Sequence, residues 1–275
     1  MCRLLGYVAD RPTSVVDVLG VDGFDRFTAL TAVHGDGWGM AWQAEDGALQ
    51  HVGVADSASA DASYDSLART PLGRAGFVHL RWASEGLAVT PENTHPFVEA
   101  ETVAGTVAFA HNGHIAPVDR LEALLDDDQR DRLRGTTDSE RYFRVLLQHV
   151  EKEQDLVSGL TRGLGLLVRE FPTSSLNALL LTSGALVAVH INSAAAAPQR
   201  RLRALFENED ELPARHTADG YFAMDYRELP SGVHVISSGL DEEGWTPVPV
   251  DSAAVVDLDT REITRLDVPA RPHSG

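Results

Sequence analysis

The order of the predicted elements constrains the fold of this chain more than any other feature of its sequence. Short apolar strands are predicted on both sides of two consecutive helices, at 138–151 and 155–170. Each helix carries an apolar stripe at helical spacing, such as Leu156, Leu160 and Leu164 in the second helix. Strands, then helices, then strands favour sheets that are covered by helices over a repeating strand–helix–strand order.

The predicted strands lie in the first and last parts of the chain. Those before the helices are 3–8, 39–42, 51–54, 75–82 and 102–110, and those after them are 177–182, 185–191, 221–226 and 233–237. No internal repeat or long linker separates them. The sequence therefore predicts one domain over residues 1–268, followed by a disordered tail at 269–275.

Composition narrows the functional classes. A single cysteine among 275 residues rules out an intramolecular disulfide and a cysteine-based zinc cage. A formal net charge of −18 argues against binding to nucleic acid or anionic lipid. No apolar run has the length of a membrane span, and the first residues lack the basic and apolar regions of a signal peptide. We therefore expect a cytoplasmic protein that binds neither membranes nor nucleic acid.

The one cysteine, Cys2, directly follows Met1. Because the side chain after Met1 is small, removal of the initiator methionine is expected. The mature chain would then begin with a residue that carries a thiol and a free α-amine on the same carbon. A thiolate is a good nucleophile, and an α-amine with a pKa of about 7.7–8.0 is a usable base near neutral pH. The structural alternative for Cys2 is a small buried hydrophobe at the start of a strand.

Polar clusters lie at the ends of several predicted elements. They span residues 34–39, 79–86, 110–114 and 136–140. Arg81 is a natural bidentate partner of a carboxylate, although a lone arginine at a strand end is commonly a surface ion pair. Asn112 and Gly113 offer an amide and a backbone N–H to an oxyanion, or form an Asn-Gly hairpin turn. Asp138 is either a helix cap or a ligand for a cation.

The motifs, taken together and in this order, resemble those of a known family. Cys2 is followed by Arg-Trp-Ala-Ser at 81–84, Asn-Thr-His-Pro-Phe at 93–97, His-Asn-Gly at 111–113 and Thr-Asp-Ser-Glu at 137–140. This combination resembles the class II glutamine amidotransferases, which are N-terminal-nucleophile hydrolases. The opening residues look most like the short stand-alone members, among them the γ-glutamyl hydrolases of ergothioneine biosynthesis and related bacterial amidotransferase-like proteins.

The resemblance implies a fold and an activity. The expected fold is α+β, a four-layer αββα sandwich with two mostly antiparallel sheets between helical layers. Cys2 would be the nucleophile and its own α-amine the acid–base group. The Asn112 side chain and the Gly113 N–H would form the oxyanion hole. A γ-glutamyl amide would then be hydrolysed through a thioester on Cys2, releasing glutamate and either ammonia or an amine.

The resemblance also implies how the substrate is held. Arg81 would bind the α-carboxylate and Asp138 the α-ammonium of glutamine or of a γ-glutamyl conjugate. Trp82 and Ser84 would line the glutamyl pocket. Larger synthase-linked members usually carry Thr-His at the positions of Ser84 and Glu85, so Glu85 adds an acid near the pocket mouth. No metal or other cofactor is implied.

Several readings stay open at this point. The substrate is either glutamine or a γ-glutamyl conjugate such as an ergothioneine-type intermediate, and a separate synthase could accept the ammonia. A binding protein without turnover would use Arg81 and Asp138 equally well. A metal enzyme is the third reading, because four histidines fall in or near the motifs: His79, His95, His111 and His114.

Overall fold

The first sheet is built around strand β1 (Arg3–Thr13) in this computed structural model, which describes residues 2–206, 208, 211–240 and 243–269. Its strand order is β11–β9–β10–β1–β4–β2–β3, and every pairing is antiparallel. The other strands are β2 (Trp38–Gln43), β3 (Leu49–Val54), β4 (Gly73–Leu80), β9 (Met224–Leu229), β10 (Gly232–Ser237) and β11 (Thr246–Pro247). The predicted removal of Met1 and the tail from 270 onward lie outside the described residues.

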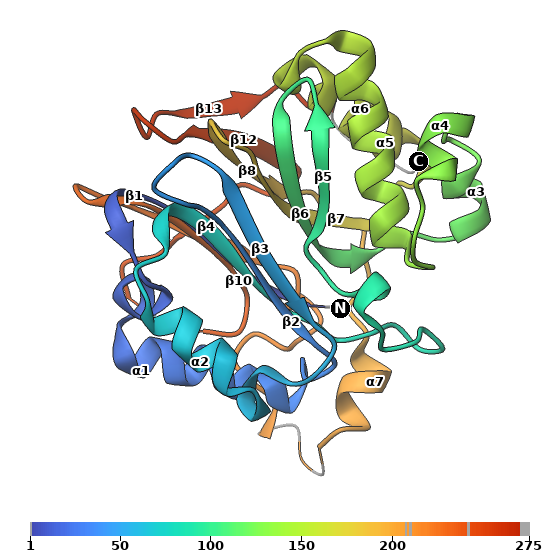
Figure 1. Ribbon diagram of the computed structural model, residues 1–275. Helices are drawn as coiled ribbons and strands as arrows, with labels where there is room; N and C mark the ends of the chain where they lie inside the picture. The colour runs from blue at the N-terminus through green and yellow to red at the C-terminus, as the bar shows by residue number, and fades with distance from the viewer. Residues whose placement is uncertain (1, 207, 209–210, 241–242, 270–275) are drawn as a thin grey trace.

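The second sheet has the strand order β13–β12–β8–β7–β6–β5 and is also antiparallel throughout. Its strands are β5 (Phe97–Thr102), β6 (Gly105–His114), β7 (Ser175–Leu181), β8 (Ala185–His190), β12 (Ser252–Asp257) and β13 (Ile263–Leu266). The two sheets stack face to face (Figure 1). Their apposed faces are joined by a shared core that includes Leu4, Phe77, Ala110, Leu181 and Val235.

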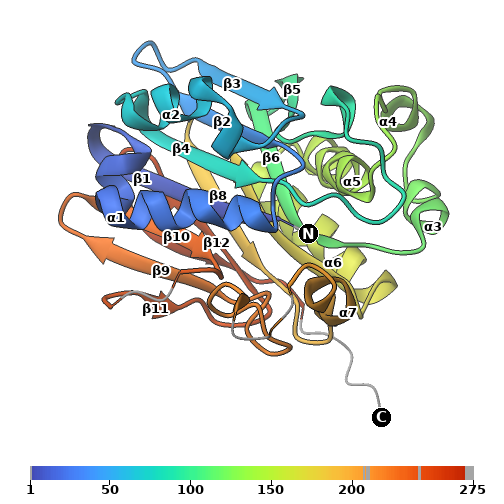
Figure 2. The same ribbon diagram turned by 90° about the horizontal axis from the view of Figure 1, so that it is seen from below.

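Helices cover the outer face of each sheet (Figures 1 and 2). Helices α1 (Val15–Ala29) and α2 (Ala62–Arg69) pack on the first sheet, and α5 (Asp138–Glu153) and α6 (Leu156–Glu170) pack on the second. The shorter helices are η1 (Leu30–Ala32), η2 (Ala58–Ala60), η3 (Pro91–Asn93), α3 (Val118–Glu122), α4 (Asp127–Asp131) and α7 (Gln199–Arg203). These layers confirm the predicted four-layer α+β sandwich.

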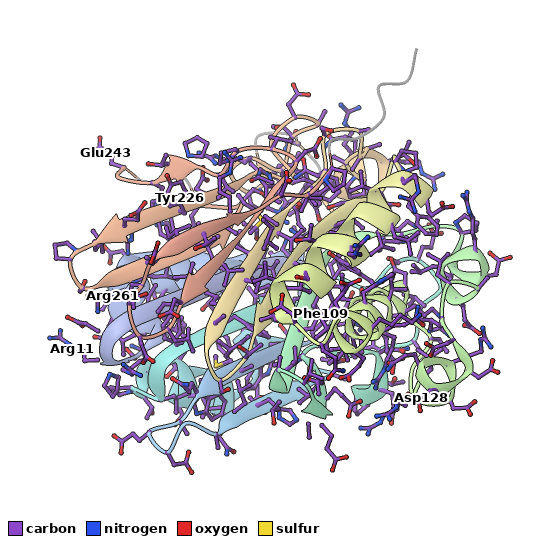
Figure 3. The ribbon with its side chains drawn as sticks, turned by 90° about the horizontal axis from the view of Figure 1, so that it is seen from above. Arg11, Phe109, Asp128, Tyr226, Glu243 and Arg261 are labelled. Carbon is purple, nitrogen blue, oxygen red and sulfur yellow. The ribbon has the colours of Figure 1, made fainter. Side chains whose placement is uncertain are left out.

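The outer cores follow from the apolar stripes of the helices. Phe109 of β6, labelled in Figure 3, stacks on Phe143 of α5 with ring centroids 5.2 Å apart. Charged side chains labelled in the same view, such as Arg11 and Asp128, point outward from the rim. No helix of the described residues is both long and apolar enough to cross a membrane.

The structure corrects two strand predictions. The strand expected at 102–110 begins only at Gly105, where a φ of 75° turns the chain between β5 and β6. Strand β6 then continues through the His-Asn-Gly motif, so the alternative of an Asn-Gly hairpin turn is wrong. The strand expected at 221–226 begins only at Met224.

Candidate active site

The site lies where the start of β1 meets the end of β6, near the N-terminus marked in Figure 2. Cys2 is buried, and its backbone nitrogen donates a hydrogen bond of 3.0 Å to Oδ1 of Asn112. The Cys2 sulfur lies 4.0 Å from the carbonyl oxygen of Trp82, which follows β4. The facing sheets thus join the cysteine and the His-Asn-Gly motif, which are 110 residues apart.

Asn112 is fully buried, and its two amide atoms differ in their bonding. While Oδ1 accepts from the Cys2 nitrogen, Nδ2 has no hydrogen-bond partner. A buried donor without a partner costs about 1–3 kcal/mol, so such groups in folded proteins call for an explanation. A donor held unpaired beside a nucleophile is what an oxyanion hole requires.

Gly113 is required by packing. A Cβ atom at this position would lie 2.1 Å from the Ser175 carbonyl oxygen and 2.4 Å from Nε2 of His111. Such distances are far inside van der Waals contact. Any other residue would therefore push β6 away from β7 at the position next to Asn112.

Arg81 directly follows β4 and is buried, so the surface ion pair that sequence left open is wrong. Its guanidinium donates to the carbonyl oxygens of Asp36 and Ala88, each at 3.2 Å. Among the described residues, no carboxylate forms an ion pair with it. A buried guanidinium held only by carbonyl oxygens keeps its charge available for an anionic ligand.

Asp138 is the first residue of α5, but it does not cap the helix. Thr137 is the cap, because its hydroxyl accepts from the Glu140 N–H at 3.1 Å. The Oδ2 atom of Asp138 instead accepts from the Ile115 N–H at 2.6 Å and lies 3.4 Å from Nδ1 of His114. Burial acts to raise the pKa of Asp138, but the hydrogen bond from His114 and the charges of nearby histidines outweigh it and lower that pKa.

Ser84 borders a larger space, and Trp82 contacts Arg201, another residue that lines it. Arg201 of α7 stacks on the Trp82 ring at 4.3 Å and donates to the Ala83 carbonyl oxygen at 2.9 Å. A pocket of about 610 Å³ lies next to this pair. Its lining includes Ser84, Glu85, His114, Ser175, Arg201 and Phe222. Trp82 lies behind Arg201 and is not part of this lining, whereas Ser84 is.

The buried histidines between Arg81 and β6 complete the surroundings. Burial lowers the pKa of His79 to about 3 and that of His111 to about 4, so both rings are neutral near neutral pH. His111 bonds to the Ser139 hydroxyl and the Ser175 carbonyl oxygen, each at 2.9 Å. Within the described part of the chain, no three His, Cys, Asp or Glu side chains are arranged to hold a metal ion.

Sequence reasoning missed the residues directly behind the cysteine. The Arg3 guanidinium donates to the Cys2 carbonyl oxygen at 2.7 Å and to Nε2 of His216 at 2.9 Å. It also lies 4.4 Å above the ring of Tyr221. A charged residue that opens a buried strand was the available signal for Arg3. Nothing in the local sequence marked His216 or Tyr221.

Comparison with known proteins places this geometry in a family. The model of the family described as "Glutamine amidotransferases class-II" matches residues 1–209. A Haemophilus influenzae protein that bears the provisional name of a glutamine amidotransferase is 31% identical over 153 residues, 55% of this chain and 48% of that protein. A glutamine–fructose-6-phosphate aminotransferase (isomerizing) of Pseudomonas aeruginosa is 32% identical over 169 residues, 58% of this chain and 24% of its own length. The matched region thus spans about half or less of these relatives.

Solved structures share the fold at low identity. A glutamine aminotransferase class-II domain protein from Silicibacter pomeroyi has a TM-score of 0.63 and 20% identity, covering 98% of this chain and 100% of its own. Glutamine phosphoribosylpyrophosphate amidotransferase from B. subtilis has a TM-score of 0.64 and 14% identity, covering 98% of this chain and 50% of its own. With the match of the family model over most of the sequence, the conclusion is direct: this chain belongs to the class II glutamine amidotransferases.

Proposed function

We propose that the protein hydrolyses a γ-glutamyl amide through a thioester on the Cys2 sulfur. The observation that carries this proposal is the pairing of Cys2 with Asn112. The Cys2 nitrogen donates to one amide atom of Asn112, and the other is a buried donor without a partner. The proposal requires that Met1 be removed, since only a free α-amine can serve as a base.

Each step of the reaction uses one of these groups. The Cys2 α-amine takes the proton of the thiol, the resulting thiolate attacks the δ-carbonyl carbon, and the Asn112 amide and the Gly113 N–H stabilise the tetrahedral oxyanion. As the C–N bond breaks, the Cys2 ammonium gives its proton to the departing ammonia or amine. The neutral amine then takes a proton from water, which cleaves the C–S bond and releases glutamate and the free thiol.

The head of the substrate needs one cation and one anion. Arg81 would bind the α-carboxylate, because its buried guanidinium donates to the carbonyl oxygens of Asp36 and Ala88 and forms no ion pair within the described residues. Asp138 would bind the α-ammonium, and its lowered pKa keeps it charged at neutral pH. A zwitterionic glutamyl group satisfies both side chains at once.

The size of the neighbouring pocket favours a leaving group larger than ammonia. Its volume is about 610 Å³, and it is lined by Ser84 and Glu85 on the side that follows Trp82. Ammonia would leave most of this space empty. A γ-glutamyl conjugate, of which an ergothioneine-type intermediate is one example, would extend its amine into the pocket.

The second candidate is release of ammonia from glutamine to a partner synthase. It is favoured by the likeness to the P. aeruginosa aminotransferase, because the matched region covers only 24% of that protein. In this case the acceptor would have to be supplied outside the matched region.

The test is a substrate panel. Purified protein is incubated with glutamine and with γ-glutamyl amides of increasing leaving-group size, and glutamate release is measured beside a Cys2→Ala control. Preference for the larger amides supports the conjugate, whereas preference for glutamine supports the synthase reading. Binding of the panel without release from either class would make the protein a binding module, and fully active enzyme that retains Met1 would rule out the α-amine as base.

A further inference from the structure

The residue that follows Cys2, the proposed nucleophile, is a buried arginine. Arg3 has no exposed surface, and its Nε has no hydrogen-bond partner. The two terminal nitrogens donate to the Cys2 carbonyl oxygen and to His216. No carboxylate in the described ranges pairs with this charge. Burying an arginine without a carboxylate partner lowers the stability of the fold. A purely structural role therefore does not explain why an arginine stands here.

The contact with His216 fixes the state of that ring. Arginine can only donate, so Nε2 of His216 must be the acceptor. Its Nδ1 lies 3.1 Å from the Ala214 carbonyl oxygen and must therefore carry the proton. Burial and the charge of Arg3 together lower the pKa of His216 to about 3, which keeps the ring neutral at working pH.

His216 also contacts a second histidine. Nε2 of His34 lies 3.0 Å from Nε2 of His216, so the His34 nitrogen is the donor. His34 lies in the loop that leads into β2. Two residues later the Asp36 carbonyl oxygen accepts from Arg81 at 3.2 Å, and the Asp36 carboxylate accepts from the Ala83 N–H at 2.8 Å. A continuous path of contacts thus joins the nucleophile to the carboxylate-binding arginine.

We propose that Arg3 is a positioning residue: it holds the Cys2 carbonyl and, through His216 and His34, fixes the nucleophile relative to Arg81. The inference rests on the proposed function, but the Arg3 contacts themselves do not. His216 and Tyr221 lie beyond residues 1–209, the region that the family model matches. Two of the groups that contact Arg3 therefore come from a part of the chain that the family match does not cover, whereas Arg3 and His34 lie within the match.

Arg3 also brings a buried positive charge to the nucleophile. Burial lowers the pKa of Arg3, while the neighbouring Tyr221 and Cys2 side chains act to raise it in their anionic forms. The sulfur carries negative charge when it reacts as a nucleophile, so loss of the nearby Arg3 charge should slow any reaction of the sulfur.

Four variants separate positioning from simple stability. Arg3→Met removes the charge and both hydrogen bonds, and Arg3→Lys keeps only the charge. His216→Leu removes the acceptor, and His216→Gln restores one through its amide oxygen. The matched control is Arg227→Lys, since Arg227 also donates to a histidine, His234 at 3.1 Å, and stacks on a ring, Trp245 at 4.5 Å.

The first measurement is steady-state hydrolysis of the γ-glutamyl amide that the wild type cleaves best. We expect Arg3→Met to lower kcat by about 100-fold, and Arg3→Lys and His216→Leu by about tenfold, as for a misplaced reacting group. KM should stay within about twofold, because Arg81 and Asp138 are untouched. His216→Gln should recover most of kcat, and Arg227→Lys should keep all of it. Folded Arg3→Met with unchanged kcat, or a change confined to KM, would overturn the proposal.

The second measurement needs no substrate. Cys2 is the only cysteine, so the rate of alkylation by iodoacetamide reports on this sulfur alone. At neutral pH we expect Arg3→Met to react about tenfold more slowly than the wild type and Arg3→Lys to react nearly as fast. If the wild type hydrolyses nothing in the panel, the proposed function fails while this rate still decides the role of Arg3. Alkylation of Arg3→Met at or above the wild-type rate would refute that role.

Discussion

At the scale of single residues, the two amide atoms of Asn112 differ in their bonding. Its Oδ1 accepts from the Cys2 nitrogen, and its Nδ2 has no partner, so under the proposed function Nδ2 would donate to the oxyanion that forms during the reaction. We expect Asn112→Ala to lower kcat by about 10²–10³-fold, the usual cost of one oxyanion donor. Substrate binding should be largely retained, because the variant leaves Arg81 and Asp138, the groups proposed to bind the glutamyl head, unchanged.

The Asn112→Asp variant tests the Nδ2 donor of Asn112 separately from its Oδ1 acceptor. The aspartate keeps an oxygen for the Cys2 nitrogen but replaces the Nδ2 donor with an oxygen. It should therefore lose at least as much kcat as the alanine variant, and a thermal melt checks that both variants are folded. A loss of less than about tenfold in either variant would show that Asn112 is not part of the oxyanion hole.

The His114–Asp138 pair predicts a pH dependence of substrate affinity. The hydrogen bond with Asp138 raises the pKa of the half-exposed His114 above its ordinary value. Protonated His114 partly neutralises Asp138, so an α-ammonium should bind more tightly once His114 loses its proton. We expect KM to fall as the pH rises through the His114 pKa, and His114→Gln to abolish this change in a pH series of KM.

The free energy of unfolding should fall as the pH rises through the His114 pKa, whereas the affinity for substrate should rise. A histidine whose pKa is raised by folding stabilises the protein below its unfolded pKa of about 6.5. That contribution is lost as the pH rises through the folded pKa. Denaturant unfolding of the wild type and of His114→Gln over this interval checks the sign, and a wild-type curve that rises with pH relative to the variant contradicts it.

From the sequence alone, residue type and motif predict roles for Asn112, Gly113 and Arg81, and these roles stay predictions. The structure shows that Arg81 is buried and that Asn112 accepts a hydrogen bond from Cys2. Asp138 was assigned two alternatives, and only coordinates show that Thr137 takes the cap. Arg3 was passed over because its partner His216 is 213 residues away, a distance that no local pattern spans.

At the scale of elements, helix α5 presents Asp138 from its first turn. The Thr137 cap determines how that turn is held, as the Asp155 side chain does for α6 by accepting from the Ser158 N–H at 2.8 Å. We expect Thr137→Ala and Asp155→Ala each to lower the free energy of unfolding by about 1 kcal/mol. Only Thr137→Ala should also raise KM, because only that cap adjoins a substrate group.

Denaturant titration and steady-state kinetics of the two variants test this contrast. If both variants keep the wild-type KM, Asp138 is held by the Ile115 N–H and His114 rather than by the helix cap. A rise in KM for Asp155→Ala would point to a general loosening of the fold.

Physical reasons explain why some helices and strand ends could not be predicted from the sequence. Helix α1 contains Gly20 with a φ of 74°, a break that interrupts its apolar periodicity. By contrast, α5 and α6 have uninterrupted stripes and were predicted within a few residues of their ends. Strand β6 was cut short because Asn-Gly favours a turn, whereas pairing with β7 holds both residues extended.

At the scale of the whole molecule, the site exists because two sheets face each other. Cys2 precedes a strand of the first sheet, and Asn112 lies on a strand of the second. Their hydrogen bond joins the sheets at one end of the sandwich. The element order could suggest sheets under helices, but which strand ends would meet depends on the strand order, which local sequence does not encode.

We therefore expect the packing of the core between the sheets to determine the free energy of unfolding but not kcat. Leu181 of β7 is fully buried in this core, and its strand partner is Ala108, four residues before Asn112. We expect Leu181→Ala to lower the free energy of unfolding by about 2–5 kcal/mol, through lost burial and the cavity left behind. Val250→Ala, at a side chain 54% exposed, should change it by less than about 0.5 kcal/mol.

The same variant also carries a prediction about kcat. Because the proposed reacting groups lie at one end of the sandwich, kcat of Leu181→Ala should stay within about twofold of the wild type at temperatures where the variant is folded. Urea unfolding and steady-state kinetics on the same preparations provide the comparison. A large loss of kcat without a loss of stability would mean that the packing between the sheets, and not only the hydrogen bonds at their ends, sets the alignment of Cys2 with Asn112.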